Sequence, residues 1–381
     1  MRNWLLPENI EDILPPEAQR VERLRAKLLG LFRVHGYELV IPPLLEYLES
    51  LLTGTGHDLD LRTFKLVDQL SGRMMGLRAD ITPQVARIDA HLLNRKGVTR
   101  LCYAGSVLHA RPRGLNTTRE PLQIGAEIYG HAGVESDLEV QQLLGKALAA
   151  CGIRNARLDV GHVAVFRSIC RHGSIGADLE SELHEALEAK DLPALRAATR
   201  RLPGATRAAL LALPELYGDA AVLKRAERVL PKYPGIGAAL RDLRALVRNG
   251  GLPVSVDLAD LRGYHYHSGV VFAAYVPGVA NAVALGGRYD EVGKAFGRVR
   301  SATGFSMDLR EVARAAPPEA KARGIRVPWS SDPKLAAAIE KLRASGKVVV
   351  VDLPGHAATR GQLGCDRELA KHSGKWVVKK I

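Results

Sequence analysis

Four segments of the chain carry more polar side chains than a buried core requires. The first is Leu77–Gln84, in which Asp80 and Thr82 stand two residues apart. A carboxylate and a hydroxyl at this spacing can hold an ammonium group between them. The same two residue types are common at helix N-termini, where Pro83 would suit the first turn. The segment therefore predicts either a binding site for an amine or an ordinary helix start.

The second segment, Arg100–Gly130, places Gln123 and Glu127 four residues apart near its end. Side chains at even spacing on a β-strand point to the same face of the sheet. We therefore expect both polar groups on one face of a strand. Such a pair indicates either a binding pocket or a solvated surface, and periodicity alone leaves both interpretations open.

The third segment, Arg262–Gly269, holds two tyrosines and two histidines between glycines, among them Tyr266 and His267. Imidazole and phenol groups at alternate positions can line a pocket for a small polar aromatic ligand. A metal site is the more specific alternative to such a pocket. His265 and His267 could not easily chelate an ion alone, and no nearby acid or thiol completes a tetrahedral set. We therefore expect no metal.

The fourth segment, Leu285–Asp290, contains two adjacent glycines, which allow a ligand or another backbone to approach closely. The phosphate-binding patterns GxxxxGK[ST] and GxGxxG are absent from the chain. No Ser-His-Asp triad or cysteine nucleophile is evident either. The four segments thus favour ligand binding, and we expect no catalytic residue and no cofactor.

Hydrophobic periodicity predicts the elements that must position these segments. Val21, Leu24, Leu28, Leu31 and Phe32 recur at helical spacing and predict an amphipathic helix. Runs of β-branched and aromatic residues bounded by glycine and proline predict strands, two of which form a hairpin. The predicted strands are Tyr37–Ile41, Thr63–Val67, Arg100–Ala104, Ala156–Val160, Pro253–Leu258, Gly269–Val276, Val279–Leu285 and Ala302–Met307.

A change of composition marks a helical segment inside the chain. Alanine- and leucine-rich stretches punctuated by prolines fill residues 168–250. Antiparallel strands interrupted by such helices favour an α+β fold. We predict a core at 1–167 and 251–316, a helical insertion at 168–250 and a small C-terminal α/β module at 318–381. In this module, Asp332 should open a helix that runs to Leu342.

Composition and charge narrow the class of protein. Hydrophobic residues make up 46% of the 381 residues and charged residues 25%, which excludes a wholly disordered or fibrous chain. The N-terminus lacks the apolar core of a signal peptide, so we expect a cytoplasmic protein without a membrane segment. A net charge of +13 fits nucleic acid, an acidic partner or a solvated basic surface. The four cysteines lie far apart and predict buried thiols.

Together the four segments resemble the catalytic core of histidyl-tRNA synthetase, a class II aminoacyl-tRNA synthetase. Residues 12–46 resemble the N-terminal region and the first class II motif, and Arg100–Gly130 resembles the second. Arg262–Phe272 resembles the histidine-specific signature, and Gly286–Met307 resembles the third motif. The resemblance covers about residues 1–316. It implies an α+β fold with a class II-like antiparallel sheet, flanking helices, a helical insertion and a small C-terminal module.

Three departures point to a paralogous family. The synthetase positions for two ATP-binding arginines hold His109 and Glu311, and the part after residue 317 is shorter than the usual anticodon-binding domain. The chain therefore looks like a member of the regulatory-subunit family of ATP phosphoribosyltransferase, which lacks aminoacylation activity. This family is required by a short catalytic subunit in the first step of L-histidine biosynthesis. It forms a hetero-octamer of four regulatory and four catalytic chains and takes part in histidine feedback inhibition.

The resemblance also implies a histidine site and a self-association surface. The first-motif helix resembles a class II dimer element through Val21, Leu24, Leu28 and Leu31, although this face could equally pack inside one subunit. A nucleic-acid partner is not expected. An active histidyl-tRNA synthetase and another RNA-binding protein of this fold remain the alternatives. The implied histidine-binding residues are Asp80, Thr82, Gln123, Glu127, Arg262, Tyr266 and His267.

Overall fold

The computed structural model describes residues 4–53, 57–112, 114, 117–318 and 323–381. The chain divides into two compact units, Met1–Pro317 and Pro318–Ile381. Residues 113, 115 and 116, which belong to the predicted second motif, lie outside the described residues. Within the described ranges, no helix has the length and apolar character needed to cross a membrane.

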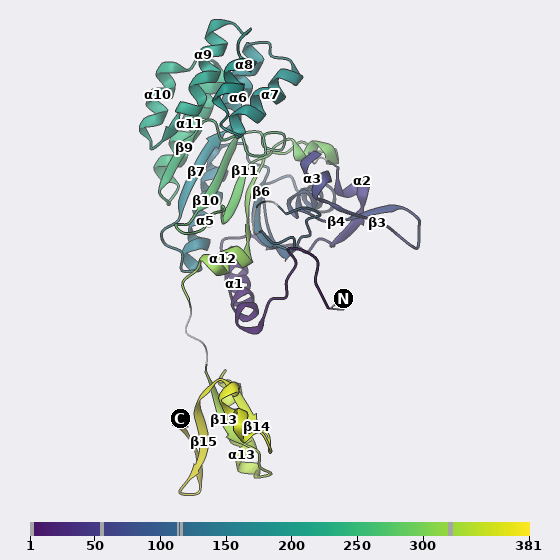
Figure 1. Ribbon diagram of the computed structural model, residues 1–381, viewed down its shortest axis with the longest axis vertical. Helices are drawn as coiled ribbons and strands as arrows, with labels where there is room; N and C mark the ends of the chain where they lie inside the picture. Colours follow the sequence, from purple (N-terminus) through teal and green to yellow (C-terminus); the bar gives the residue numbers. More distant parts are fainter. Residues whose placement is uncertain (1–3, 54–56, 113, 115–116, 319–322) are drawn as a thin grey trace. The chain divides into compact units, whose positions relative to one another are not determined.

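The larger unit combines one long sheet with helices, as Figure 1 shows. Its strands are β1 (Glu38–Leu39), β2 (Leu45–Tyr47), β3 (Phe64–Val67), β4 (Met74–Leu77), β5 (Thr99–Ser106), β6 (Leu122–Tyr129), β7 (Arg157–His162), β8 (Tyr217–Gly218), β9 (Val254–Asp257), β10 (Val270–Tyr275), β11 (Ala284–Arg288) and β12 (Ala302–Asp308). Its α-helices are α1 (Pro15–Val34), α2 (Leu48–Leu51), α3 (His57–Arg62), α4 (Thr82–Arg87), α5 (Val134–Ala150), α6 (Val163–His172), α7 (Ala177–Glu188), α8 (Leu192–Ala198), α9 (Gly204–Ala212), α10 (Ala221–Val229), α11 (Pro234–Asn249) and α12 (Leu309–Ala315). A π-helix at Ile88–Leu93 and 3₁₀ turns at Leu213–Glu215 and Val292–Phe296 complete it.

Nine strands of the described part form the main sheet in the order β1-β5-β6-β12-β11-β10-β7-β9-β8. Only the β1–β5 and β7–β9 pairs are parallel among these neighbours. Strands β2, β4 and β3 form a separate antiparallel sheet. The prediction of an α+β fold built on an antiparallel sheet with flanking helices is confirmed.

Helix α1 packs its apolar stripe against one face of the main sheet. The ring of Phe32 lies 5.9 Å from that of Phe305 on β12 in an edge-to-face arrangement. Val21, Leu24 and Leu28 are buried in the same core cluster. Of the two alternatives for this stripe, packing inside one subunit holds, because its side chains face the chain's own core.

Helices α6 to α11 follow one another between residues 163 and 249, at one end of the sheet in Figure 1. The predicted helical segment at 168–250 contains α7 to α11, but α6 begins before it at Val163 and the two-residue strand β8 was not predicted. The predicted hairpin differs more. Its second strand begins at Ala284, five residues later than predicted, although the Val283 N–H already donates to the Ala274 carbonyl oxygen at 2.8 Å. Strand β11 then continues through Gly286 and Gly287 to Arg288.

The smaller unit has its own sheet and hydrophobic cluster. Its elements are β13 (Gly324–Pro328), α13 (Pro333–Ala344), β14 (Val349–Asp352), a 3₁₀ turn at Ala357–Leu363, β15 (Cys365–His372) and β16 (Lys375–Lys380). The carboxylate of Asp332 accepts the Lys334 N–H at 2.9 Å and caps α13, as the sequence predicts. The β15–β16 hairpin was missed, because its strands alternate charged residues with few apolar ones.

Candidate functional site

Strand β6 places Gln123 and Glu127 on the face of the sheet that α4 covers, and both are almost fully buried. The carboxylate of Glu127 lies among hydroxyl groups. It accepts a hydrogen bond from Tyr103 Oη at 3.0 Å and another from Tyr289 Oη. Thr82 Oγ1 lies 3.4 Å from Glu127 Oε1. Burial of both side chains excludes the solvated surface, and the binding pocket stays a prediction.

The start of helix α4 is tied directly to strand β6. Gln123 Oε1 accepts the backbone N–H of Ile81 at 2.9 Å, and its amide nitrogen donates to Asp80 Oδ1 at 2.9 Å. The same Asp80 oxygen accepts the Thr82 N–H at 2.9 Å. Asp80 therefore serves as a helix-start residue and also faces the polar group on β6. The first and second polar segments come together here although some forty residues separate them.

Glycines on the sheet face make room for these side chains. A Cβ atom at Gly304, opposite Glu127 on β12, would lie 1.5 Å from Glu127 Oε2. A Cβ atom at Gly125 would lie 2.4 Å from Tyr103 Oη. Sequence reasoning missed Tyr103 on β5, Gly304 on β12 and Tyr289 just after β11, because only the folded sheet brings them close to Glu127 on β6. The Gly-rich runs that contain Gly125 and Gly304 were the available signal.

Burial controls the protonation of this group. Desolvation raises the pKa of Glu127 to about 8, although its hydrogen bonds from Tyr289 and Tyr103 act in the opposite direction. Burial also raises the pKa of both tyrosines well above the ordinary value, so their hydroxyls remain neutral donors. A cation or N–H donor that binds beside Glu127 would therefore stabilise the charged form of its carboxyl group.

Tyr266, on the loop Arg262–Gly269, packs next to the polar cluster around Glu127. Its ring stacks on that of Tyr289 at 5.2 Å. Its hydroxyl is buried and has no hydrogen-bond partner among the described residues. Nearly all buried polar groups in proteins are hydrogen-bonded, to protein or to water. A buried hydroxyl without a protein partner next to Tyr289 and Glu127 marks a place for a ligand or water.

His267 is held in one tautomer beside Tyr266. Its Nδ1 lies 3.2 Å from the carbonyl oxygen of Arg288. Because a carbonyl only accepts, Nδ1 carries the proton and Nε2 keeps a lone pair. Desolvation lowers the pKa of His267 to about 4, so the imidazole is neutral near pH 7. A Cβ atom at Gly287 would lie 2.9 Å from this ring, which explains glycine there.

Arg262 lies at the margin of the site. Its Nε donates to Asp260 Oδ1 at 2.8 Å and its Nη1 donates to Tyr275 Oη at 2.9 Å. In the described contacts, its guanidinium does not reach Glu127 or Asp80. Its positive charge is near enough to contribute to the lowered pKa of His267. The structure thus brings six of the seven expected residues into one region and places Arg262 at its border.

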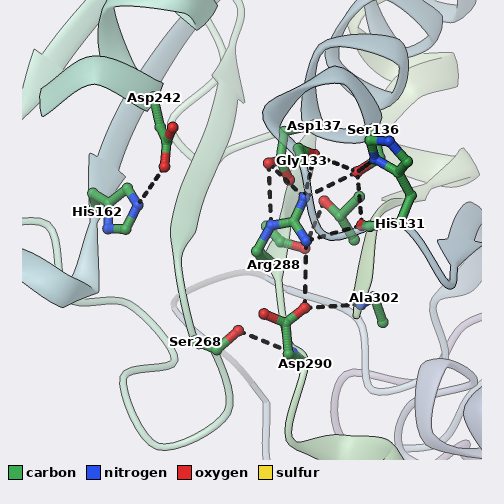
Figure 2. Close-up of polar contacts among 12 residues, drawn as sticks. His131, Gly133, Ser136, Asp137, His162, Asp242, Ser268, Arg288, Asp290 and Ala302 are labelled. Carbon is green, nitrogen blue, oxygen red and sulfur yellow. Dashed lines mark hydrogen bonds and ion pairs between the residues drawn. The ribbon is translucent and has the colours of Figure 1, made fainter. Parts of the chain in front are cut away.

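A buried arginine holds the loop to the sheet, as Figure 2 shows. Arg288 Nη2 donates to Asp137 Oδ2 at 2.7 Å at the start of α5. Its backbone carbonyl accepts the Ser268 N–H at 2.7 Å, and Ser268 Oγ accepts the Asp290 N–H at 2.9 Å. The hydrogen bonds of Arg288 therefore link the helix, strand β11 and the loop that carries Tyr266 and His267.

The two positions that depart from the synthetase pattern are both engaged. His109 is buried, and its Nε2 lies 3.0 Å from the Ala79 carbonyl oxygen. Glu311 accepts a hydrogen bond from Arg314 at 3.0 Å. The neighbouring Arg310 is buried and pairs with Glu11 from the N-terminal segment. Neither His109 nor Glu311 supplies the cationic group that a nucleotide triphosphate needs.

The described residues include no group suited to hold a metal ion, and their cysteine thiols are mostly buried. No group of three or more His, Cys, Asp or Glu side chains there could hold a metal ion. Cys102, Cys151 and Cys170 are buried as the sequence predicts, and Cys365 is partly buried. Desolvation raises the pKa of the Cys102 and Cys151 thiols to about 11 and that of Cys170 to about 12, which disfavours the reactive thiolate.

Two family models cover most of the chain. The model described as histidyl-tRNA synthetase matches residues 9–312. The model of the C-terminal domain of ATP phosphoribosyltransferase subunit HisZ matches residues 322–379. The second match coincides with the smaller unit of the structure.

Curated relatives match over the full length. Proteins from Ralstonia pickettii and Cupriavidus taiwanensis, each named ATP phosphoribosyltransferase regulatory subunit, are 63% and 61% identical and align over 99% of this chain and 98% of their own. A Bacillus halodurans structure titled ATP phosphoribosyltransferase regulatory subunit/histidyl-tRNA synthetase is 26% identical, with a TM-score of 0.85 over 95% of this chain and 96% of its own. A histidyl-tRNA synthetase from Nostoc sp., 18% identical with a TM-score of 0.79 over 99% of this chain and 97% of its own, shares the fold.

Proposed function

The chain belongs to the ATP phosphoribosyltransferase regulatory subunit family, and on that premise we propose that it is the non-catalytic regulatory subunit of this enzyme and binds L-histidine at the Glu127 site. Its role is to support a short catalytic subunit in the first step of L-histidine biosynthesis and to carry the histidine feedback signal. The relatives' names support the regulatory role, and the chemistry of the site supports the ligand.

One observation carries the choice of ligand. The buried hydroxyl of Tyr266 has no hydrogen-bond partner in the part of the chain that the structure describes, and it lies beside a buried carboxyl, Glu127, whose pKa is raised to about 8. A ligand that presents an N–H donor to the carboxylate and a polar atom to the hydroxyl would satisfy both groups. An imidazole does so with its two ring nitrogens, and its flat ring suits the stacked tyrosines.

The remaining groups suit the other end of histidine. Asp80 and Thr82 present a carboxylate and a hydroxyl to the α-ammonium group, and Gln123 holds Asp80 in place. Arg262 would meet the α-carboxylate by exchanging a contact with Asp260 or Tyr275 for the ligand. Neutral His267 adds a lone pair at the edge of the pocket.

The assembly is part of the same proposal. The chain is proposed to act in the cytoplasm, in a hetero-octamer of four regulatory and four short-form catalytic chains. Self-association is proposed to use the open edge at β1, because the α1 stripe is buried. Leu39 and Ile41 are 51% and 79% exposed there. A groove of about 560 Å³ lies alongside, lined in part by Leu29, Arg33 and Leu39.

Titration calorimetry with L-histidine tests the ligand and its site. A hydrogen bond to a charged group contributes about 1.5–3 kcal/mol, so Glu127→Gln should weaken binding by about 10–150-fold. Glu188→Gln, at an exposed position on α7, is the matched control and should bind like the wild type. Equal affinity of the wild type and Glu127→Gln would refute the site.

The regulatory role is tested with the catalytic subunit. Phosphoribosyl transfer is measured with the catalytic subunit alone, with the wild-type chain added, and then with increasing histidine. We expect the chain to raise activity and histidine to lower it. Glu127→Gln should still raise activity but should require correspondingly more histidine for inhibition, because an effector acts only through its differential affinity for two states. No activation by the wild-type chain would contradict the role.

A further inference from the structure

The loop Arg262–Gly269 contacts two different parts of the molecule. Tyr266 and His267 lie on its inner side, at the proposed histidine site. Tyr264, two residues earlier, is only 4% exposed and packs away from that site. Its neighbours belong to helices α6 and α7, which begin the helical segment between β7 and β9.

Both the ring and the hydroxyl group of Tyr264 make contacts with the helices. Its ring packs edge-to-face on Phe166 of α6 at 5.3 Å and stacks on His184 of α7 at 5.1 Å. Its hydroxyl donates a hydrogen bond to Glu180 of α7. The guanidinium of Arg167 lies 4.7 Å from the ring centroid. One side chain of the loop thus contacts two helices of the insertion.

Backbone contacts fix the same loop to the same helices. Arg167 Nη2 donates to the Tyr264 carbonyl oxygen at 2.6 Å. His184 Nε2 lies 3.4 Å from the Leu261 carbonyl oxygen. The positive charge of Arg167 also contributes, after desolvation, to the lowered pKa of His267. The two helices therefore hold the loop at Tyr264 and the chain just before the loop at Leu261.

The geometry points to Tyr264 as a positioning residue: through its contacts with Glu180, His184 and Phe166, helices α6 and α7 hold Tyr266 and His267 in the histidine-binding arrangement, and histidine in turn stabilises α7. The inference rests on the proposed histidine site. Tyr264 does not touch the ligand in this account. It reduces the number of loop conformations, so that a larger fraction of the chain is competent to bind.

Linkage makes the effect reciprocal. If α7 stabilises the binding-competent loop, a ligand that selects this loop must stabilise its contacts with α7 by the same factor. Histidine should therefore slow hydrogen exchange in α7, although no residue of α7 belongs to the site. A tyrosine that only filled space in the core would give no such ligand-dependent change.

The test uses the full chain and two single substitutions with their double variant. Tyr264→Phe removes the donor and Glu180→Ala removes the acceptor of the hydroxyl–carboxylate hydrogen bond, and both leave the aromatic packing in place. Tyr233→Phe is the matched control, since the Tyr233 ring stacks on His172 elsewhere in the insertion. Circular dichroism and thermal unfolding establish that each variant is folded before any binding is measured.

We expect Tyr264→Phe to raise the dissociation constant for L-histidine by about 3–10-fold, which corresponds to a fall of the competent fraction to a third or a tenth. Glu180→Ala should have a similar effect, and the double variant should be no worse than either single variant, because both substitutions remove the same contact. Histidine should protect α7 amides in the wild type and in Tyr233→Phe, but less in Tyr264→Phe.

The outcomes separate this inference from the proposed function. Wild-type chain that binds no histidine overturns both. Wild-type chain that binds histidine without slower exchange in α7 overturns the inference alone. Additive effects of Tyr264→Phe and Glu180→Ala, or unchanged affinity in a folded Tyr264→Phe, also overturn it and leave the histidine site standing.

Discussion

The Cβ position of Gly304 lies 1.5 Å from Oε2 of Glu127, so the carboxylate occupies the space that any side chain at residue 304 would need. The two residues are directly paired on neighbouring strands β12 and β6. Nothing larger than hydrogen fits at residue 304 while Glu127 keeps its bonds to Tyr103 and Tyr289. The position of the central acid is thus determined by a glycine as much as by its hydrogen-bond partners.

Gly304→Ala should expel the Glu127 carboxylate from its place. We expect histidine binding to weaken at least about 10-fold and stability to fall by about 1–3 kcal/mol, the usual range for overpacking a core. Gly204→Ala, at a position open to solvent, is the control and should change neither. Calorimetry and urea unfolding provide both measurements. Unchanged histidine affinity in Gly304→Ala would show that the carboxylate is not needed where the structure places it.

The raised pKa of Glu127 predicts a pH-dependent stability in the absence of ligand. Its folded pKa is about 8 against an ordinary value of 4.5, so the folded chain retains a proton that the unfolded chain has lost in this window. The free energy of unfolding should therefore fall by about 1.4 kcal/mol per pH unit between pH 5 and pH 8 from this group. Glu127→Gln should lack that contribution. Urea unfolding at several pH values should show the two proteins diverging, and parallel profiles would contradict the raised pKa.

Arg310 and Glu11 predict an asymmetric response to substitution. Arg310 is 2% exposed, and its carboxylate partner comes from the half-exposed N-terminal segment. Glu11→Gln removes the ion-pair partner of a buried guanidinium and should cost about 1–3 kcal/mol. Arg310→Met removes the charge itself and should cost less, because an apolar group of similar length can replace a buried charge. Glu8→Gln is the control. Denaturant unfolding that ranks Arg310→Met below Glu11→Gln in stability would argue against this account.

No amino-acid activation is expected. His109 and Glu311 replace two ATP-binding arginines of the resembling synthetases, and both are engaged by Ala79 and Arg314. Loss of one such donor to a reacting phosphate lowers the rate by about 10²–10³, and here two are lost. Histidine-dependent pyrophosphate–ATP exchange should remain at the blank, with a histidyl-tRNA synthetase as the positive control. Exchange clearly above the blank would restore the synthetase alternative.

Local patterns in the sequence predicted much of the fold and the local placement of four polar residues of the site. Gln123 and Glu127 could be placed on one face because a strand repeats every two residues. Asp80 and Thr82 could be placed at a helix start because their side chains bond nearby backbone groups. The pairing of these two segments was not available from spacing. It depends on a hydrogen bond between Gln123 and Asp80 that only the folded chain makes.

Contacts between distant strands were beyond the sequence patterns. Tyr103 reaches Glu127 from β5 and Tyr289 from just after β11, and nothing in a two-residue or helical period connects three strands. The partner of Arg310 lies 299 residues earlier, in a segment without regular structure. The stripe on α1 was correctly predicted as apolar, but periodicity could not tell the chain's own core from the surface of a second copy.

The order of strands in the main sheet also bears on synthesis of the chain at the ribosome. Strand β6 lies between β5, its near neighbour in sequence, and β12, which follows it by more than 170 residues. One edge of β6, together with the buried acid it carries, therefore stays unpaired until residue 308 has left the exit tunnel. An open edge of this kind invites pairing with other nascent chains. The helical segment is translated within that interval, so slow elongation there would prolong the exposure, and a folding assistant that covers the β6 edge would shorten it.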